Sequence, residues 1–320
     1  MINDNLKTRN DYAKGQLGVL KVALQTQDEA LIKYQLGKLK VASELNELCS
    51  LVEKGANAQA LAMIDDLLAF KVSEKCEFDD ECFARLVKWA DDNEIQPFQF
   101  PREKERLTEL KELNLSCCDL ECLPNEFVNL QSLEKLNLNS FNPIRDNIFK
   151  FQEFPKVLCE LKNLKELDLE RCDFKTLPDE FVNLQNLEKL NLTWNKFQEF
   201  PKIVDILTRL KNLKVLYLCE CGLNSLPDEF ANLQSLEKLD LRGNNFYGFP
   251  KALYGLKNLK ELNIEYCSLK TLPDEFTNLQ SLEGLELRGN DFYEFPKVIN
   301  KLKNLKECDI KEADFQAKEN

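Results

Sequence analysis

The chain has 320 residues, of which 43% are hydrophobic and 31% are charged, and its formal net charge is −12. An acidic chain repels phosphate groups, so this balance argues against nucleic acids and membrane surfaces as partners. The chain contains no histidine, which removes the commonest general base and most zinc sites, so we expect no enzyme, no cofactor and no metal ion.

Residues 1–95 are expected to form an α-helical N-terminal domain. Apolar residues follow helical spacing around Leu17–Leu24, a second helix is indicated at Ala58–Phe70, and Asp79 is suited to cap a later one. We expect three or four antiparallel helices, the last of which covers the adjoining repeat. Their role stays open between a cap, a second partner-binding module and a dimerisation bundle.

The first residues lack the apolar core of a cleavable signal peptide, and no apolar run is long enough to span a bilayer. Several of the 12 cysteines recur at one inward position of the repeat described next, where a thiol acts as a small hydrophobic side chain. We therefore expect a cytoplasmic protein, or one that is exported without a cleavable signal peptide.

One phrase, L-x-x-L-x-L-x-x-(N or C), returns about nine times between residues 96 and 310, most often at steps of 23 residues. Two longer steps contain residues 141–148 and Ile203–Leu207, which we expect to form packed helical turns. Residues 311–320 read as a polar tail. The first leucines of the copies are Leu110, Leu133, Leu164, Leu187, Leu213, Leu236, Leu259, Leu282 and Leu305.

Within each copy, apolar and polar residues alternate as in a strand with one buried face, so stacked copies predict a parallel sheet. A second phrase, LPDEF, predicts a short 3₁₀ turn that returns the chain, because proline ends the strand. Phenylalanines of this phrase are expected in the core, and Asn195, Asn244 and Asn290 are expected to bond neighbouring loop backbones. Cysteine replaces asparagine at Cys118, Cys172, Cys221 and Cys267.

Both phrases resemble those of the leucine-rich-repeat family, in the form of its intracellular bacterial and plant members. The resemblance covers about Leu107–Ile310. It implies an α/β fold: a right-handed solenoid, or horseshoe, whose parallel sheet lines the concave face on which partners usually bind. The family resemblance favours a scaffold that binds a protein or peptide there. The alternatives are a bacterial effector that targets a host protein and, with less support, an enzyme whose site lies in the N-terminal helices.

Two repeat types alternate, L-K-N-L-K-E and L-Q-S-L-E-K, so the first outward position of the strands alternates in charge. We interpret this column as a ladder that neutralises itself rather than as a binding site. Its members are Glu112, Lys135, Glu166, Lys189, Val215, Lys238, Glu261, Gly284 and Glu307.

Large aromatic residues are unusual at outward strand positions, and aromatic and arginine side chains dominate binding hot spots. We therefore predict a partner footprint centred on Trp194 and Tyr217, with scattered and inconsequential surface aromatics as the alternative. The cysteine groups at residues 117–122 and 219–221 lack the spacing of a zinc site. The remaining predicted partner-binding residues are Tyr266, Arg171, Arg242, Arg288, Glu170, Glu220 and Glu265.

Overall fold

The computed structural model describes residues 78–118, 120, 122–140, 151 and 153–316. The helices expected within the first 77 residues and the insertion at residues 141–148 lie outside the described residues. The repeats belong to one compact unit, Cys76–Asn320. Among its described helices, none combines the length and the apolar character needed to cross a membrane.

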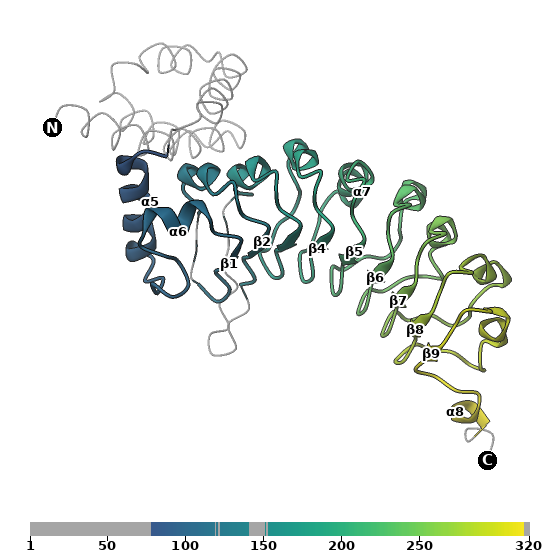
Figure 1. The fold of residues 1–320 in the computed structure, drawn as a ribbon. Coiled ribbons are helices and arrows are strands. Elements are labelled where there is room, and N and C mark those ends of the chain that lie inside the picture. Colours follow the sequence, from purple (N-terminus) through teal and green to yellow (C-terminus); the bar gives the residue numbers. More distant parts are fainter. Residues whose placement is uncertain (1–77, 119, 121, 141–150, 152, 317–320) are drawn as a thin grey trace, which may run out of the picture. The chain divides into compact units, whose positions relative to one another are not determined.

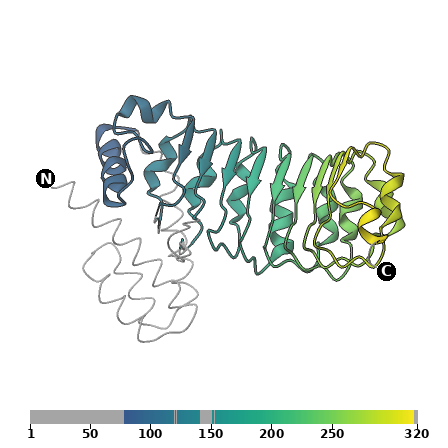
Figure 2. The same cartoon turned by 90° about the horizontal axis from the view of Figure 1, so that it is seen from below.

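A parallel sheet with one short strand per repeat runs through this unit (Figures 1 and 2). Neighbouring strands pair in strict register, and the central residue of each three-residue strand, such as Leu113 or Leu216, is buried. The predicted parallel sheet is thereby confirmed. The nine strands are β1 (Glu112–Asn114), β2 (Lys135–Asn137), β3 (Glu166–Asp168), β4 (Lys189–Asn191), β5 (Val215–Tyr217), β6 (Lys238–Asp240), β7 (Glu261–Asn263), β8 (Gly284–Glu286) and β9 (Glu307–Cys308).

Short 3₁₀ helices return the chain on the side opposite the sheet, which is the convex side of this unit (Figure 1). A proline stands at the N-cap of each, where its fixed φ angle ends the preceding extended segment. Phe127, Phe181, Phe230 and Phe276 have no exposed surface, so the predicted aromatic column is part of the core. The turns are η2 (Asn125–Asn129), η3 (Lys156–Glu160), η4 (Asp179–Asn183), η5 (Asp228–Asn232), η6 (Lys251–Gly255), η7 (Asp274–Asn278) and η8 (Lys297–Lys301).

The fourth repeat carries a longer helix in place of its 3₁₀ turn. Helix α7 (Phe200–Thr208) begins with Pro201 in its first turn and buries Ile203, Val204, Ile206 and Leu207. The packed helical turn predicted for this insertion is confirmed, because its apolar residues fall on one face of the helix.

A ladder of buried asparagine and cysteine side chains joins successive repeats. The amide of Asn244 donates to the carbonyls of Leu218 and Leu241, at 2.9 and 2.7 Å, and its oxygen accepts from the backbone N–H of Leu223. Cys221 occupies the same place in the preceding repeat, and its thiol donates to the carbonyl of Leu192 at 3.3 Å. The predicted asparagine bonds are confirmed. The cysteine thiol donates to a backbone carbonyl as the asparagine amide does, but it does not replace the asparagine oxygen as an acceptor.

Helix α5 (Asp80–Asp92) packs against the turn η2 of the first repeat. The carboxylate of Asp79 accepts from the N–H of Cys82 and so caps α5, as expected. The Trp89 ring meets the Phe127 ring edge-on at 5.1 Å, and Leu86 has no exposed surface. Because of this packing, α5 lies in the same compact unit as the repeats. A shorter helix, α6 (Lys104–Thr108), leads into β1.

Among the described residues, those at the C-terminal end of the array cover it only in part. Strand β9 has two residues, and Leu305 and Ile310 beside it stay half-exposed. Helix α8 (Ala313–Gln316) follows, and the Phe315 ring contacts the Phe295 ring at a centroid distance of 6.0 Å. The segment expected to be only a polar tail therefore includes a short helix with one apolar anchor.

Candidate partner-binding face

The second outward residue of most strands serves the fold. In six repeats an asparagine or aspartate oxygen accepts from the backbone N–H two residues later, at 2.8–3.0 Å, and so fixes the turn that leaves the strand. The fold therefore accounts for these polar residues without a binding partner. The six are Asn114, Asn137, Asp168, Asn191, Asp240 and Asn263.

Strand β5 departs from this pattern at every outward position. It carries Val215 where most strands carry a charge, Tyr217 where most carry Asn or Asp, and Cys219 beyond its end. Val215 and Tyr217 are half-buried, and Cys219 is only 4% exposed. The short Cys219 side chain is covered between Thr193 and Asp240, and burial raises its pKa to about 12.

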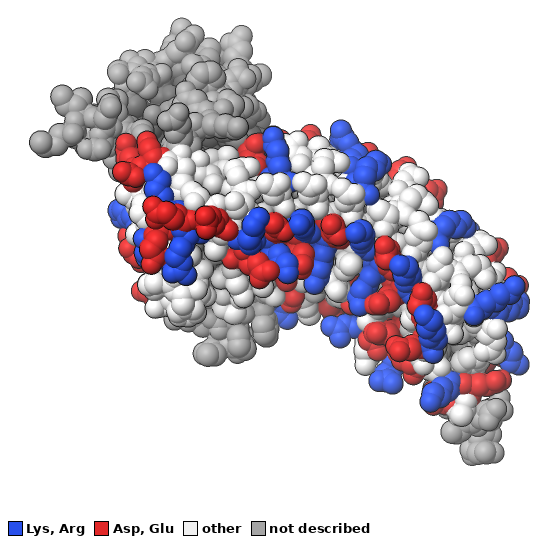
Figure 3. All heavy atoms as spheres, viewed as in Figure 1, with Lys and Arg blue, Asp and Glu red and all other residues white. Residues whose placement is uncertain are grey.

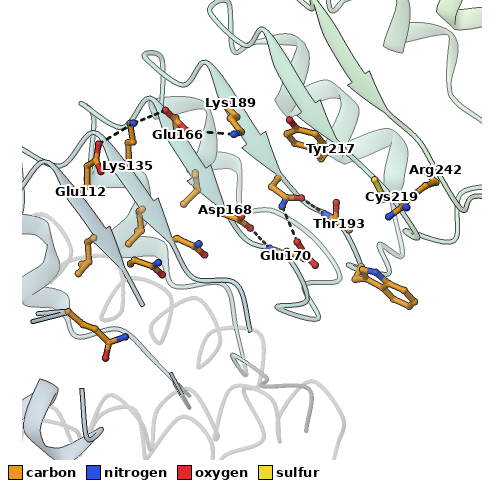
Figure 4. Close-up of a pocket in the computed structure, with 18 of the residues that line it drawn as sticks. Glu112, Lys135, Glu166, Asp168, Glu170, Lys189, Thr193, Tyr217, Cys219 and Arg242 are labelled. Atoms are coloured by element: carbon orange, nitrogen blue, oxygen red, sulfur yellow. Dashed lines mark hydrogen bonds and ion pairs between the residues drawn. The ribbon is translucent and has the colours of Figure 1, made fainter. Parts of the chain in front are cut away.

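A groove of about 920 Å³ runs over the open face of β1 to β5 and reaches Arg242, just beyond β6 (Figure 4). Its floor is the sheet, and Phe98 and Gln99, from the loop between α5 and α6, contribute to one wall. The Phe98 side chain is 85% exposed. Four of the predicted partner-binding residues line the groove, namely Glu170, Trp194, Tyr217 and Arg242.

The fourth outward position has a left-handed backbone. Arg171, Trp194, Glu220 and Tyr266 have φ angles of 52–61°, a conformation that costs an ordinary side chain about 1–2 kcal/mol. Such strain often accompanies binding sites. Together with Gly243 and Gly289, which have the same conformation without this cost, these residues form one column.

Large side chains of this column lean over the next repeat. The Arg171 guanidinium lies 4.8 Å from the centre of the Trp194 ring, a cation–π distance. A Cβ atom on Gly289 would lie 2.3 Å from the Tyr266 ring, so glycine is required beneath the tyrosine. Gly243 stands in the same relation to the Glu220 carboxylate. In each of these three cases, a large side chain of one repeat therefore packs on the residue of the same column in the next repeat.

The predicted site residues fall into two groups. Arg171 stacks on Trp194 and so adjoins the four residues that line the groove. Glu220, Glu265, Tyr266 and Arg288 belong to the repeats of β5, β7 and β8 and do not line it. Among these, Tyr266 is 57% exposed.

Sequence reasoning identified Tyr217 but missed the wall at Phe98, the acceptor Asp168 and the apolar character that Val215 and Cys219 add beside Tyr217. For β5 a signal existed, since Val215, Tyr217 and Cys219 break three columns within one repeat. Burial raises the pKa of Asp168, and also that of Glu170, which accepts from the Asn191 amide at 3.3 Å.

The alternating charges form the predicted ladder. The Lys135 ammonium lies 3.1 Å from the Glu112 carboxylate and 3.3 Å from that of Glu166, so one lysine bridges three strands (Figure 4). A second alternating column, which the sequence analysis overlooked, runs one residue earlier. There Glu134 binds Lys111 and Lys165 at 2.8 and 2.6 Å, and these two bonds lower its pKa to about 2. Figure 3 shows the resulting band of alternating colours.

The thiols near the start of the array do not converge with other ligands. Cys117 and Cys122 are exposed, and Cys118, expected in the core, is half-buried because the first repeat has no preceding repeat and meets Gln99 instead. Among the residues that the structure describes, no group of three or more Cys, Asp or Glu side chains is arranged to hold a metal ion.

Comparisons with known proteins point to one family. A model of the leucine-rich repeat region matches residues 101–222 and 204–320. A leucine-rich-repeat protein of Leptospira interrogans is 36% identical, with a TM-score of 0.53 over 62% of this chain and 48% of that protein. Internalin C2 of Listeria monocytogenes gives a TM-score of 0.53 at 20% identity over 72% of this chain and 93% of that one, a likeness of fold alone.

A shorter likeness links the repeats to a much larger protein. The probable serine/threonine-protein kinase pats1 of Dictyostelium discoideum is 37% identical over 119 residues, which are 28% of this chain and 4% of the kinase. The chain thus spans less than half of the Leptospira protein and a small part of the kinase. Repeats of this fold generally act in protein–protein interaction. With the family model matched across residues 101–320 and the fold in agreement, the chain belongs to the leucine-rich-repeat family.

Proposed function

We propose that this protein is a non-enzymatic interaction module that binds a protein segment or peptide across the open face of its sheet, centred on β5. The observation that carries the proposal is the apolar character of β5. Val215, Tyr217 and Cys219 fill its three outward positions, whereas each of the other eight described strands presents polar or charged side chains at most of these positions.

The fold alone does not account for Tyr217. Asparagine at this position caps the following turn in four other repeats, and tyrosine gives up that hydrogen bond. Tyr217 lies inside the groove instead, with the Lys189 ammonium 5.8 Å from its ring. Trp194, 41% exposed, adds a second aromatic group to the lining of the same groove. Aromatic side chains beside polar groups are the usual anchors of a protein interface.

The charge of the chain favours a protein partner over a nucleic acid. The formal net charge is −12, and most lysines of the sheet face are already bound to carboxylates. The thiols of Cys172, Cys221 and Cys267 donate to backbone carbonyls in the core, which supports a reducing compartment such as the cytoplasm.

A peptide selection tests the proposal. A library of short random peptides is selected against the full chain, and enriched peptides are measured against Tyr217→Asn and, as a matched control, Tyr247→Asn. Tyr247 is 90% exposed and lies outside the groove. Because asparagine fits the column, Tyr217→Asn is expected to keep the fold but to weaken binding by about tenfold or more.

The control Tyr247→Asn should bind like the wild type. Failure to enrich any peptide, or equal binding by both variants, would contradict the proposed function. Thermal unfolding of both variants shows whether a loss of binding reflects the site or the fold.

A further inference from the structure

The charge ladder of the first outward column has two gaps. At most positions this column alternates strictly, and opposite charges face each other across neighbouring strands. Val215 stands where the alternation requires a carboxylate, and Gly284 stands where it requires an ammonium group. All other positions of the column keep the expected sign.

The first gap leaves two lysines on either side of an apolar residue. Val215 pairs with Lys189 on β4 and with Lys238 on β6. In the intact part of the ladder, Lys135 has a carboxylate on both sides. The Lys189 ammonium instead lies 3.8 Å from Glu166, which it shares with Lys135, and on the other side it meets the Tyr217 ring (Figure 4).

Lys238 forms an ion pair on its far side. Its ammonium lies 2.5 Å from the Glu261 carboxylate on β7. Val215 therefore lies between strands that carry Lys189 and Lys238, with the Tyr217 ring near the Lys189 ammonium, and no carboxylate occupies its position in the column. A carboxylate from outside the chain would take the place of the absent glutamate.

The second gap has the opposite sign. Gly284 pairs with Glu261 on β7 and with Glu307 on β9. Within the described part of the chain, Glu307 forms no ion pair, whereas Glu261 has only Lys238. A Cβ atom on Gly284 would find only the Glu261 side chain, at 3.7 Å, so the space above this glycine is open. A cationic group would fit between the two carboxylates.

We infer that the partner segment is an extended peptide that lies across the strands and carries an acidic side chain over Val215 and a basic side chain over Gly284. This rests on the proposed function. The two gaps are three strand spacings apart in the sheet order, which is about 14 Å. An extended peptide rises about 3.4 Å per residue, so the acid and the base stand about four residues apart.

The spacing also agrees with the geometry of an extended chain. Side chains alternate between the two faces of a strand, so residues separated by an even number point the same way. An acid and a base four residues apart thus both face the sheet, and the intervening residues pass over β6 and β7. The outward residues there include Asp240 and Asn263, each of which accepts a backbone N–H with its Oδ1 atom.

The chain offers two variants that close one gap each. Val215→Glu supplies the carboxylate that Glu166 and Glu261 supply elsewhere in the column, and Gly284→Lys supplies the missing ammonium group. Both restore the prevailing residue type, so both are expected to fold. The random-peptide selection described above is repeated with each variant and with the wild type.

Wild-type protein should enrich peptides with an acid and a base about four residues apart. Val215→Glu should lose the preference for the acid and keep that for the base, and Gly284→Lys should do the reverse. For one enriched peptide, replacing its acid by the matching amide should weaken binding to the wild type by about fivefold and leave binding to Val215→Glu unchanged.

The outcomes separate this inference from the proposed function. Peptides that lose affinity with Tyr217→Asn but show no acid–base spacing would overturn the inference and leave the binding face in place. Equal effects of the acid-to-amide exchange on the wild type and on Val215→Glu would overturn it as well. Enrichment of purely apolar peptides at the same face would mean that Tyr217 and Trp194 bind the peptide without any contribution from the two gaps, which would also overturn the inference.

Discussion

At the second outward position of most strands, one side-chain oxygen atom accepts a backbone hydrogen bond that fixes the following turn. At Asp168 that oxygen accepts from the Glu170 N–H at 3.0 Å, as the asparagines of other repeats do. Aspartate adds a charge that the bond does not need. Burial of the carboxylate raises its pKa, so its ionised form carries a cost that asparagine at the same place avoids.

We therefore predict that Asp168→Asn stabilises the protein at neutral pH. A carboxyl group whose folded pKa is raised binds its proton more tightly in the native state than in the unfolded chain. Stability is then lost as the pH rises from the unfolded value, about 4, through the folded value. The gain from Asp168→Asn should appear above this window and vanish below about pH 4.

Urea denaturation of both proteins across this pH range measures the effect. A variant less stable than the wild type at neutral pH would show that the carboxylate is favourable there, for instance through the Lys189 charge. The sequence places Asp168 and Tyr217 in the same column but does not reveal that one caps a turn and the other does not, since that depends on hydrogen bonds.

Among the elements, the ladder of asparagine and cysteine joins each strand and turn to the next. Asparagine satisfies three backbone groups, because its amide donates twice and its oxygen accepts once. The thiol of a cysteine repeat reaches only carbonyls, at 3.3–3.4 Å in the closest cases. The alternation of repeat types therefore alternates strong and weak joints along the array.

Replacing members of the ladder by alanine should reveal this difference. Asn244→Ala leaves the Leu223 N–H and two carbonyls buried without their partner, and we expect a loss of about 3 kcal/mol in the free energy of unfolding. Cys221→Ala removes one weak donor and a small volume, and we expect a loss of about 1 kcal/mol. Chemical denaturation measures both; equal losses would contradict the unequal joints.

Repeated elements could be predicted from the sequence because each copy repeats the same local signals. The strand alternation, the proline before each turn and the apolar run of Ile203–Leu207 correspond to β-strands, 3₁₀ turns and helix α7. The wall at Phe98 could not be predicted in this way. It comes from a single loop, and its place depends on how α5 packs against the first repeat.

Across the described array, most charges and polar groups are satisfied within the protein itself. Lysine and glutamate alternate along two neighbouring columns, and within each column they form ion pairs from strand to strand. Glu134 belongs to one column and Lys135 to the other. The pattern is interrupted on β5, where an apolar strand replaces the polar one, and at Gly284 on β8. We therefore place the partner over the open face of the sheet from β5 toward β8, while the convex turns serve the core.

A covalent footprint of the lysines tests this placement most directly. The full chain is acylated with and without a bound peptide from the selection, and modified positions are quantified by mass spectrometry. Lys189 and Lys238 flank β5 on the sheet, and their side chains are 45% and 41% exposed. Lys251 and Lys297 are exposed on η6 and η8. We predict that the peptide protects Lys189 and Lys238 and leaves Lys251 and Lys297 unchanged; protection of the latter pair, with Lys189 and Lys238 still fully reactive, would contradict the account.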